Sequence, residues 1–261
     1  MKEQRYTTQL QAGLGLIQET KVLLELWQPG MSTTALYQAA LHSGLFPNVT
    51  ARRLRNIVAE CFAPRFLIPP DHPAEVLKTI SSRIPQAQLI QLLFLFTARA
   101  NQILADFVKE VFWIQYSSGQ SQLGLEEARL FVTQANQKGK TAHPWSESTI
   151  QRVSGYLIGC CADFGLLETS RKRSRRILSF RLEPSIAAIV AYDLHFFGLG
   201  DNAIIAHPDW QLFGLQREDI REELKRLSLK GYLILQTAGD VNRIGWLFKN
   251  WEDLIHVVAE S

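Results

Sequence analysis

The chain of 261 residues has a formal net charge of only +3, with 46% hydrophobic and 20% charged residues. This composition excludes a disordered chain, because enough apolar surface is present to offset the entropy lost on ordering. The small net charge hides a strong asymmetry along the sequence. Residues 171–181 (RKRSRRILSFR) contain six basic side chains and no acidic one, so the rest of the chain is net negative.

Helical periodicity dominates the front of the chain. Apolar residues at helical spacing predict an amphipathic helix over residues 9–27, which ends before a Pro-Gly pair. A second helix is expected to begin at Ser32 or Thr33 and to end at Gly44, where glycine favours a left-handed exit. A third helix begins after Thr50, which is suited to cap it. This order predicts a helix-turn-helix.

The middle of the chain combines a proline-rich connector over residues 64–85 with a long apolar helix over residues 86–115. Its most apolar stretch, LIQLLFLF at residues 89–96, contains Gln91 and is closed by Arg99. The stretch is well short of the roughly 18 to 20 apolar residues that a membrane span needs. We therefore expect a buried core helix here.

A second helix-turn-helix pattern follows, with helices over residues 125–137 and 146–164 joined by a short polar turn. Ser146 is expected to cap the second of these helices. Strand-favouring residues over 177–182 predict a hairpin with the basic segment at its tip. Helix, turn, helix and hairpin is the order of elements in a winged helix.

From residue 184 onward the pattern predicts helices over 186–197 and 217–230, then a hairpin of 232–236 and 243–248 turned at 238–240. The expected fold class is mainly α, with a helical core, helix-turn-helix or winged-helix-like units and short β-hairpins. The expected domains are 1–70 (helix-turn-helix-like), 71–116 (connector and central apolar helix), 117–184 (winged-helix-like unit with the basic hairpin) and 185–261 (C-terminal helix and hairpin unit).

No secretory signal is expected at the N-terminus, because it carries the acidic Glu3 and lacks a long apolar core. The three cysteines form neither a disulfide framework nor a zinc-binding spacing, since Cys160 and Cys161 are adjacent and Cys61 is distant. The expected setting is a reducing cytoplasm, with all three cysteines as small core residues.

Catalytic and cofactor-binding motifs are missing from the sequence. The six histidines are scattered, and no two have the spacing of metal ligands. The pair Gly13 and Gly15 lies within a predicted helix rather than after a strand, so close packing is expected and not a phosphate-binding loop. We therefore expect a protein without catalytic residues, metal or cofactor, and a dispersed active site is the alternative.

A first basic patch lies on the helix that follows Thr50. Its apolar positions face inward, which leaves Arg52, Arg53 and Arg55 pointing outward near its N-terminal end. In a helix-turn-helix, that end of the second helix enters the DNA major groove, and the planar arginine fork can bind phosphate or guanine. The alternative is an ordinary charged surface helix.

The second and denser patch is the cluster at residues 171–176. Five like charges in six residues repel one another unless an anionic partner is present, so we expect the cluster to bind a polyanion. Five neutralised phosphates give a slope of roughly −4 to −5 in log affinity against log salt. A nuclear address is the alternative function of such a run. The residues of the cluster are Arg171, Lys172, Arg173, Arg175 and Arg176.

Other polar side chains complete the predicted DNA-binding surface. The lysines of the turn and the arginine of the following helix are expected on the same side as the basic cluster. The hydroxyl groups at the start of that helix are suited to donate hydrogen bonds to phosphate. These additional residues are Lys138, Lys140, Ser148, Thr149, Arg152 and Arg181.

Two stretches carry a family resemblance: residues 11–67, which begin QAGLGLIQETKVLLELW, and residues 145–168, WSESTIQRVSGYLIGCCADFGLLE, with the basic hairpin after them. The chain resembles the BrxA family of bacterial BREX (bacteriophage exclusion) defence systems over nearly its whole length. The resemblance implies a small, non-catalytic, helix-rich protein that binds double-stranded DNA and is encoded beside a methyltransferase and an ATPase. Some members have been described as membrane proteins, and the fold has been likened to that of the RNA antitermination factor NusB.

These observations predict a cytoplasmic, non-catalytic protein of an anti-phage system that binds double-stranded DNA mainly through phosphates. No membrane contact is expected, other BREX components are the second class of partner considered, and the sequence sets no oligomeric state. The alternatives are an RNA-binding NusB-like protein and an assembly subunit whose basic segment docks on an acidic partner. A nuclease is the remote third.

Overall fold

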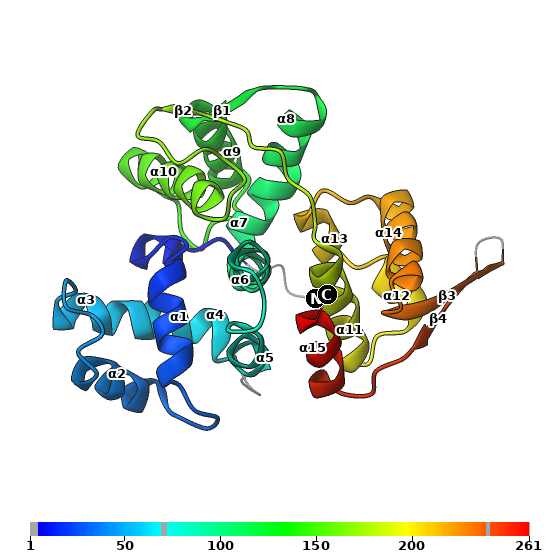
Figure 1. The fold of residues 1–261 in the computed structure, drawn as a ribbon. Coiled ribbons are helices and arrows are strands. Elements are labelled where there is room, and N and C mark those ends of the chain that lie inside the picture. Colours follow the sequence, from blue (N-terminus) through cyan, green and yellow to red (C-terminus); the bar gives the residue numbers. More distant parts are fainter. Residues whose placement is uncertain (1–4, 69–71, 239–240, 261) are drawn as a thin grey trace. The chain divides into compact units, whose positions relative to one another are not determined.

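The computed structural model describes residues 5–68, 72–238 and 241–260 (Figure 1). Within these ranges helices predominate, and the strands form only two small antiparallel sheets. This confirms the mainly α fold class predicted from the helical periodicity.

Two compact units make up the fold. The first contains Met1–Lys78 and Leu93–Phe180, and the second contains Thr79–Leu92 and Arg181–Ser261. The chain enters each unit twice, and helix α6 (Gln86–Ala100) is divided between them. The division into the four smaller domains described above stays a prediction.

The start of the first unit differs from the single helix predicted over residues 9–27. The structure has a short 3-10 helix, η1 (Gln9–Ala12), a break, and then helix α1 (Ile17–Leu26). A Cβ atom on Gly15 would lie only 2.6 Å from the Cβ atom of Asp163. Close packing is therefore the role of this glycine, as predicted, but it acts in a break between helices and not inside one.

The predicted helix-turn-helix segment contains helices α2 (Thr33–His42) and α3 (Ala51–Asn56). Ser32 and Thr50 cap them, and each side-chain oxygen accepts a hydrogen bond of 3.2 Å from the backbone N–H three residues later. Gly44 in the turn has a φ of 69°, in the left-handed region that glycine adopts without steric cost. The structure confirms these helix starts, their caps and the glycine exit.

The helix continues beyond α3 through a wider π-helical turn, η2 (Ile57–Phe62), into α4 (Ala63–Phe66). Pro64 has no N–H to donate to the carbonyl of Glu60, and its ring would collide with that carbonyl in a regular helix. The wider turn accommodates the proline without ending the helix. The proline-rich connector predicted from residue 64 therefore begins later than expected.

Helix α5 (His72–Ile80) occupies much of that predicted connector. Lys78 connects it to the end of α1, because its Nζ atom donates hydrogen bonds of 2.7 to 3.0 Å to the carbonyls of Leu24, Glu25 and Trp27. A cation at this position satisfies carbonyls that have no partner within the helix and complements the helix dipole.

The apolar middle of the chain is a buried helix, as predicted, but it is interrupted. Leu93, Phe94 and Leu95 in α6 are each at most 1% exposed. At Asn101 the chain leaves the helical conformation, with φ −131° and ψ 89°, so the single helix predicted over residues 86–115 is wrong. The elements after the interruption are α7 (Gln102–Phe107), η3 (Val108–Phe112) and α8 (Trp113–Ser117).

The last part of the first unit contains the second predicted pair of helices. Strand β1 (Gln122–Gly124) leads directly into α9 (Leu125–Gln137), and α10 (Glu147–Asp163) follows after a turn. Ser146 caps α10, as predicted from its sequence. Strand β2 (Ser174–Arg176) then pairs antiparallel with β1, which precedes both helices (Figure 1).

The second unit contains the predicted C-terminal helices and hairpin. Strands β3 and β4 pair in the register Leu233 with Trp246, and in Figure 1 they form an arm that extends beyond α12 and α14. Part of their predicted turn, residues 239–240, lies outside the described residues. The elements are α11 (Pro184–Phe196), α12 (Asp201–Ile205), α13 (Asp209–Leu212), α14 (Arg217–Leu229), β3 (Leu233–Ala238), β4 (Val241–Trp246) and α15 (Trp251–Ala259).

The cysteines and the apolar helices agree with the interior roles expected of them. All three cysteines are free and buried. Burial raises the pKa of the Cys160 thiol to about 12, so this side chain stays neutral near pH 7 and behaves as a core residue. No helix in the described ranges combines the length and the apolar character needed to cross a membrane.

Candidate nucleic-acid interface

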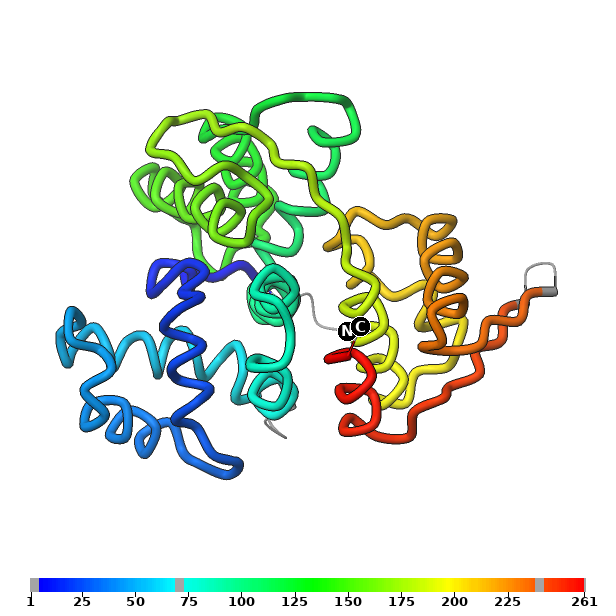
Figure 2. The backbone as a smooth tube through the Cα atoms, viewed as in Figure 1, coloured from blue at the N-terminus to red at the C-terminus, as the bar shows by residue number. Residues whose placement is uncertain are grey.

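The basic segment forms the end of a hairpin that follows α10, which we call the basic hairpin (residues 166–178). Its two sides are joined by the N–H of Glu168, which donates to the carbonyl of Arg176 at 2.9 Å, and the N–H of Leu178, which donates to the carbonyl of Leu166 at 3.0 Å. The edge of β2 that faces away from residues 166–168 pairs with β1. Three extended segments therefore lie side by side, and their path can be followed in Figure 2.

The strand predicted over residues 177–182 is displaced toward the N-terminus. Pairing covers residues 174–178 and ends there. Beyond this point the chain leaves for the second unit, where the Arg181 carbonyl accepts a hydrogen bond of 2.9 Å from the side chain of Gln91. Strand-favouring residues in 179–182 therefore have no partner strand among the described residues. Arg181 belongs to the second unit, whereas the basic hairpin belongs to the first.

The basic cluster divides into three exposed cations at the tip and two that the fold engages. Arg171, Lys172 and Arg173, which we call the basic tip, are exposed, and none forms an ion pair with a carboxylate of the described residues. Arg176 lies 3.7 Å from Glu168 across the hairpin, as an exposed ion pair. Arg175 alternates with its strand neighbours, so it points to the opposite face, where it is half-buried and its Nε atom is inaccessible.

The start of α10 brings three of the predicted polar residues together. Ser148 and Thr149 lie in its first turn, and their hydroxyl groups are each 3.1 Å from the Ser146 hydroxyl. Arg152 lies one turn later, with its Nε atom 3.4 Å from the Ser148 carbonyl. This exposed end therefore presents hydroxyl groups, an arginine and the positive end of the helix dipole.

Lys138 and Lys140 lie at the opposite end of α9 from the basic hairpin. The carbonyl of Arg173 accepts a 2.9 Å hydrogen bond from the N–H of Leu125, the first residue of α9, whereas the lysines follow its last residue. A helix of this length spans about 20 Å, which separates the two groups. Lys140 also has internal partners, with its Nζ atom 3.7 Å from Glu110 and 5.7 Å from the centre of the Tyr6 ring.

The first predicted patch is exposed at the start of α3, as its helical spacing indicated. Arg52, Arg53 and Arg55 are all exposed, whereas Leu54 between them is 1% exposed. The guanidinium of Arg53 donates a hydrogen bond to the carbonyl of Ala12 in η1. One arginine of the patch is therefore held in place by the N-terminal segment.

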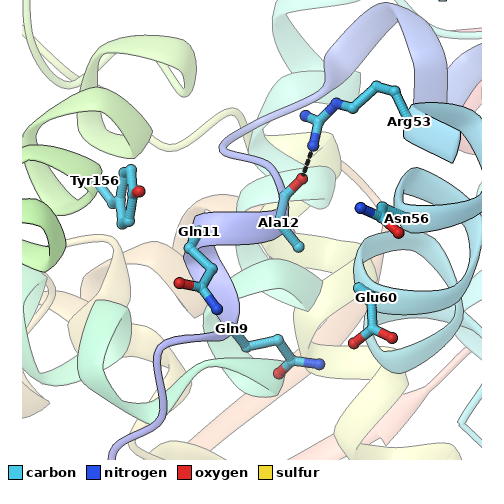
Figure 3. Close-up of a pocket in the computed structure, with 7 residues that line it drawn as sticks. All are labelled: Gln9, Gln11, Ala12, Arg53, Asn56, Glu60 and Tyr156. Carbon is cyan, nitrogen blue, oxygen red and sulfur yellow. Dashed lines mark hydrogen bonds between the residues drawn. The ribbon is translucent and has the colours of Figure 1, made fainter. Parts of the chain in front are cut away.

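A pocket lies between the α3–η2 helix and α10. It has a volume of about 510 Å³, and η1 contributes residues to it between the two helices (Figure 3). Arg53, Asn56 and Glu60 line it from one side and Tyr156 of α10 from the other. The two predicted helix-turn-helix segments thus belong to one continuous surface of the first unit.

Polar contacts fix the linker between η1 and α1, and so hold these helices together. Arg65 is only 3% exposed and donates hydrogen bonds to the carbonyls of Leu14, at 2.7 Å, and Gly13. The N–H of Gly15 donates to a carboxylate oxygen of Asp163, at the end of α10, at 2.8 Å. The linker is therefore bonded to the end of the α3–η2–α4 helix and to the end of α10.

Burial shifts the pKa values of the two charged groups that bond this linker, Asp163 and Arg65. Burial raises the pKa of Asp163, while the hydrogen bond from Gly15 and the nearby Arg175 act in the opposite direction. Burial also lowers the pKa of Arg65. Two carbonyls accept hydrogen bonds from the Arg65 guanidinium, so two of its five N–H donors are matched despite the burial.

Sequence reasoning missed every pocket residue except Arg53, and three of those missed, Asn56, Glu60 and Tyr156, lie on the two helices that flank the pocket. Asn56 follows Arg53 by three residues, and Glu60 follows Asn56 by four. Tyr156 follows Arg152 by four, so each shares a helix face with a predicted arginine. That spacing is a usable signal, but only the fold shows that the two faces meet. Within the described ranges, no group of three or more His, Cys, Asp or Glu side chains is placed to hold a metal ion.

Comparisons with known proteins assign the family and the fold. The family model for BrxA matches residues 4–192. An uncharacterized protein from Magnetospirillum magneticum, known from its crystal structure, is similar with a TM-score of 0.57 and 17% sequence identity, covering 74% of this chain and 95% of that chain. No curated protein matches. The structural likeness supports the fold alone, whereas the family match covers well over half of the sequence, and the chain belongs to the BrxA family of BREX phage-defence systems.

Proposed function

We propose that this chain is a non-catalytic, double-stranded DNA-binding component of a BREX phage-defence system. The observation that carries the proposal is the basic tip, whose three exposed cations have no carboxylate partner in the described structure. Neighbouring like charges raise the free energy of the free protein, and a polyanion relieves that repulsion. Duplex DNA supplies phosphates at a matching density.

The arrangement of elements around the tip supports this proposal. The elements follow the order of a winged helix, which is a strand, two helices and a hairpin. The second strand of the hairpin, β2, pairs back with the first strand, β1. In helix-turn-helix proteins the second helix enters the major groove with its N-terminal residues against the bases. In this chain that helix is α10, which carries Ser148 and Thr149 in its first turn and Arg152 one turn later. The basic hairpin would then lie along the phosphate backbone.

Duplex DNA is favoured over RNA by the shape of this surface. A B-form major groove admits an α-helix, whereas the major groove of A-form RNA is too narrow for side chains to read. Single-stranded RNA would instead need exposed aromatic rings for stacking. Phe94, Phe96 and Phe112 are at most 2% exposed, so these rings belong to the core and are not available for stacking.

A salt titration of binding to random-sequence duplex DNA tests the proposal. Replacing the five basic residues at 171–176 by alanine should weaken binding to every sequence and leave the melting temperature nearly unchanged. Because Arg175 is half-buried and Arg176 pairs with Glu168, only the three cations of the basic tip are fully available to phosphate. The slope of log affinity against log salt should therefore flatten by about 3, not by the larger value for five phosphates. Lys138→Ala with Lys140→Ala, at the other end of α9, is the matched control and should leave the slope within about one unit.

The alternatives make distinct forecasts in the same assay. Tighter binding to structured RNA than to duplex DNA of equal length would favour the RNA-binding function. Absence of any nucleic-acid binding, together with co-purification of a BREX component that depends on the basic hairpin, would favour an assembly subunit. Cleavage of DNA in the presence of magnesium would contradict the non-catalytic role.

A further inference from the structure

The pocket between η1, the α3–η2 helix and α10 is lined, apart from Arg53, by side chains that are not among the predicted duplex contacts. Figure 3 shows Tyr156 on one side, Arg53, Asn56 and Glu60 on the other, and the η1 residues between them. Its volume of about 510 Å³ falls within the range of small-molecule sites, which is roughly 300 to 1,000 Å³. The polar side chains that line it are Gln9, Gln11, Arg53, Asn56, Glu60 and Tyr156.

Most of these polar groups are not engaged by the protein itself. In the described parts of the chain, the side chains of Asn56, Glu60 and Tyr156 form no hydrogen bond or ion pair, and the same holds for Gln9 and Gln11. An amide offers both a donor and an acceptor, and a carboxylate offers acceptors only. Together they match the mixed donors and acceptors on the edge of a nucleobase.

The other two lining groups suit the remaining parts of a nucleotide. The half-buried ring of Tyr156 provides an aromatic face at the wall of the pocket, and stacking on such a face is tolerant of base identity. Arg53 is oriented by its hydrogen bond to the Ala12 carbonyl, and the rest of its guanidinium fork is available to a phosphate. The pocket thus presents a stacking face, a polar edge and a cation.

We propose that this pocket binds a single nucleotide, with the base against Tyr156 and the phosphate on Arg53. The inference deepens the proposed DNA-binding function and rests on it for its biological context. Tyr156 follows Arg152 by one helical turn, so the pocket lies on the face of α10 that the duplex would approach. The nucleotide is either free in solution or an unstacked member of the bound nucleic acid, and the chemistry of recognition is the same.

Calorimetric titration of the full chain at low salt tests the proposal directly. The probes are the four deoxynucleoside monophosphates, with deoxyribose 5-phosphate as a control that lacks the base. At least one mononucleotide should bind and deoxyribose phosphate should bind much more weakly. Tyr156→Ala should lower the affinity by about tenfold or more, because stacking on the ring is lost. Tyr156→Phe keeps the ring and should retain the affinity.

A second arm distinguishes the two sources of the nucleotide. A short duplex with one unpaired nucleotide is compared with the same duplex fully paired. If no mononucleotide binds, a preference for the unpaired site that Tyr156→Ala abolishes and Tyr156→Phe retains identifies the bound nucleic acid as the source. If neither arm depends on Tyr156, the nucleotide pocket is disproved.

The design separates failure of this inference from failure of the proposed function. Binding of the fully paired duplex depends on the basic tip, so it should respond to substitutions at Arg171, Lys172 and Arg173. Tyr156→Ala should leave that binding nearly unchanged. Mononucleotide binding without duplex binding would contradict the duplex function alone. Duplex binding with no Tyr156-dependent binding of a mononucleotide or of the unpaired site would contradict the pocket alone.

Discussion

The two units contain the same succession of helix and hairpin with very different surfaces. In the first unit α10 is followed by the basic hairpin, and in the second α14 is followed by β3 and β4. The basic tip has no internal carboxylate partner in the described structure, whereas Lys225 and Arg226 of α14 lie 2.7 and 3.0 Å from glutamates of their own helix. The order of elements is therefore shared, but the run of three adjacent unpaired cations in the basic tip has no counterpart on β3 and β4.

The two hairpins also differ in how their outer strand is held. In the first unit, β1 supplies a third strand. In the second, side chains replace a strand: Tyr192 accepts hydrogen bonds from the N–H groups of Leu247 and Phe248 at 2.9 and 3.3 Å, and Asp201 accepts one from Ile244 at 2.9 Å. The two hairpins therefore differ in which of their polar groups the fold leaves available.

Charge reversal in the basic tip should give the largest effect. Arg171→Glu, Lys172→Glu and Arg173→Glu together should weaken duplex DNA binding by about a hundredfold at low salt, because three phosphate contacts become repulsive. A gel-shift titration measures this. Arg243→Glu, on the exposed surface of β4, is the matched control in the other hairpin and should change the affinity by less than about threefold. Equal losses of DNA affinity for both variants would show that the position of the basic tip does not matter for binding.

Removal of one hydroxyl group tests how the second hairpin is held. Tyr192→Phe should lower the free energy of unfolding by about 2 kcal/mol, because the Tyr232 carbonyl and two backbone N–H groups lose their hydrogen bond. Urea denaturation measures the change. Tyr37→Phe is the control, since its hydroxyl has no hydrogen bond in the described structure. DNA affinity should be the same for both variants, and an unchanged denaturation midpoint for Tyr192→Phe would contradict the role assigned to its hydroxyl.

The smallest expected effect is a gain in DNA affinity on removal of a carboxylate from the basic hairpin. Glu168→Gln removes the carboxylate that lies 3.7 Å from Arg176 and makes a fourth cation available to phosphate. Since both side chains of this pair are exposed, the gain should be only about twofold to threefold in DNA affinity. Fluorescence anisotropy with matched duplexes resolves such a difference. A loss of affinity would show that the ion pair positions Arg176 for binding.

Local signals predicted the elements well, and contacts between distant residues explain the errors. Caps at Ser32, Thr50 and Ser146 located three helix starts, because a cap acts within one turn. The break after η1 depends on Asp163, which is 148 residues from Gly15 in sequence. No local pattern contains that information. The strand at 174–178 was displaced for the same reason, since its partner β1 precedes both helices.

The predicted site shows the same division between local and distant information. Exposure of Arg52, Arg53 and Arg55 follows from helix periodicity alone and was foreseen. The separation of Lys138 and Lys140 from the basic hairpin follows from the path of α9, which a charge pattern does not describe. The pocket required three elements to be placed together. Its residues were therefore visible in the sequence only as members of exposed helix faces.

Each unit is built from two separate stretches of the chain. This affects the order in which the units can fold during synthesis and the design of fragments. Residues 79–92 leave the ribosome before most of their own unit, whose remaining part begins at residue 181. The Gln91 amide, which bonds the chain at Arg181 and Glu183, must wait for these partners to be synthesised. A fragment cut at residue 181 would lack the first piece of the second unit, so neither unit can be expressed as one uninterrupted stretch of sequence. Supplying residues 79–92 through a circular permutation or as a fused segment is the natural route to an isolated second unit.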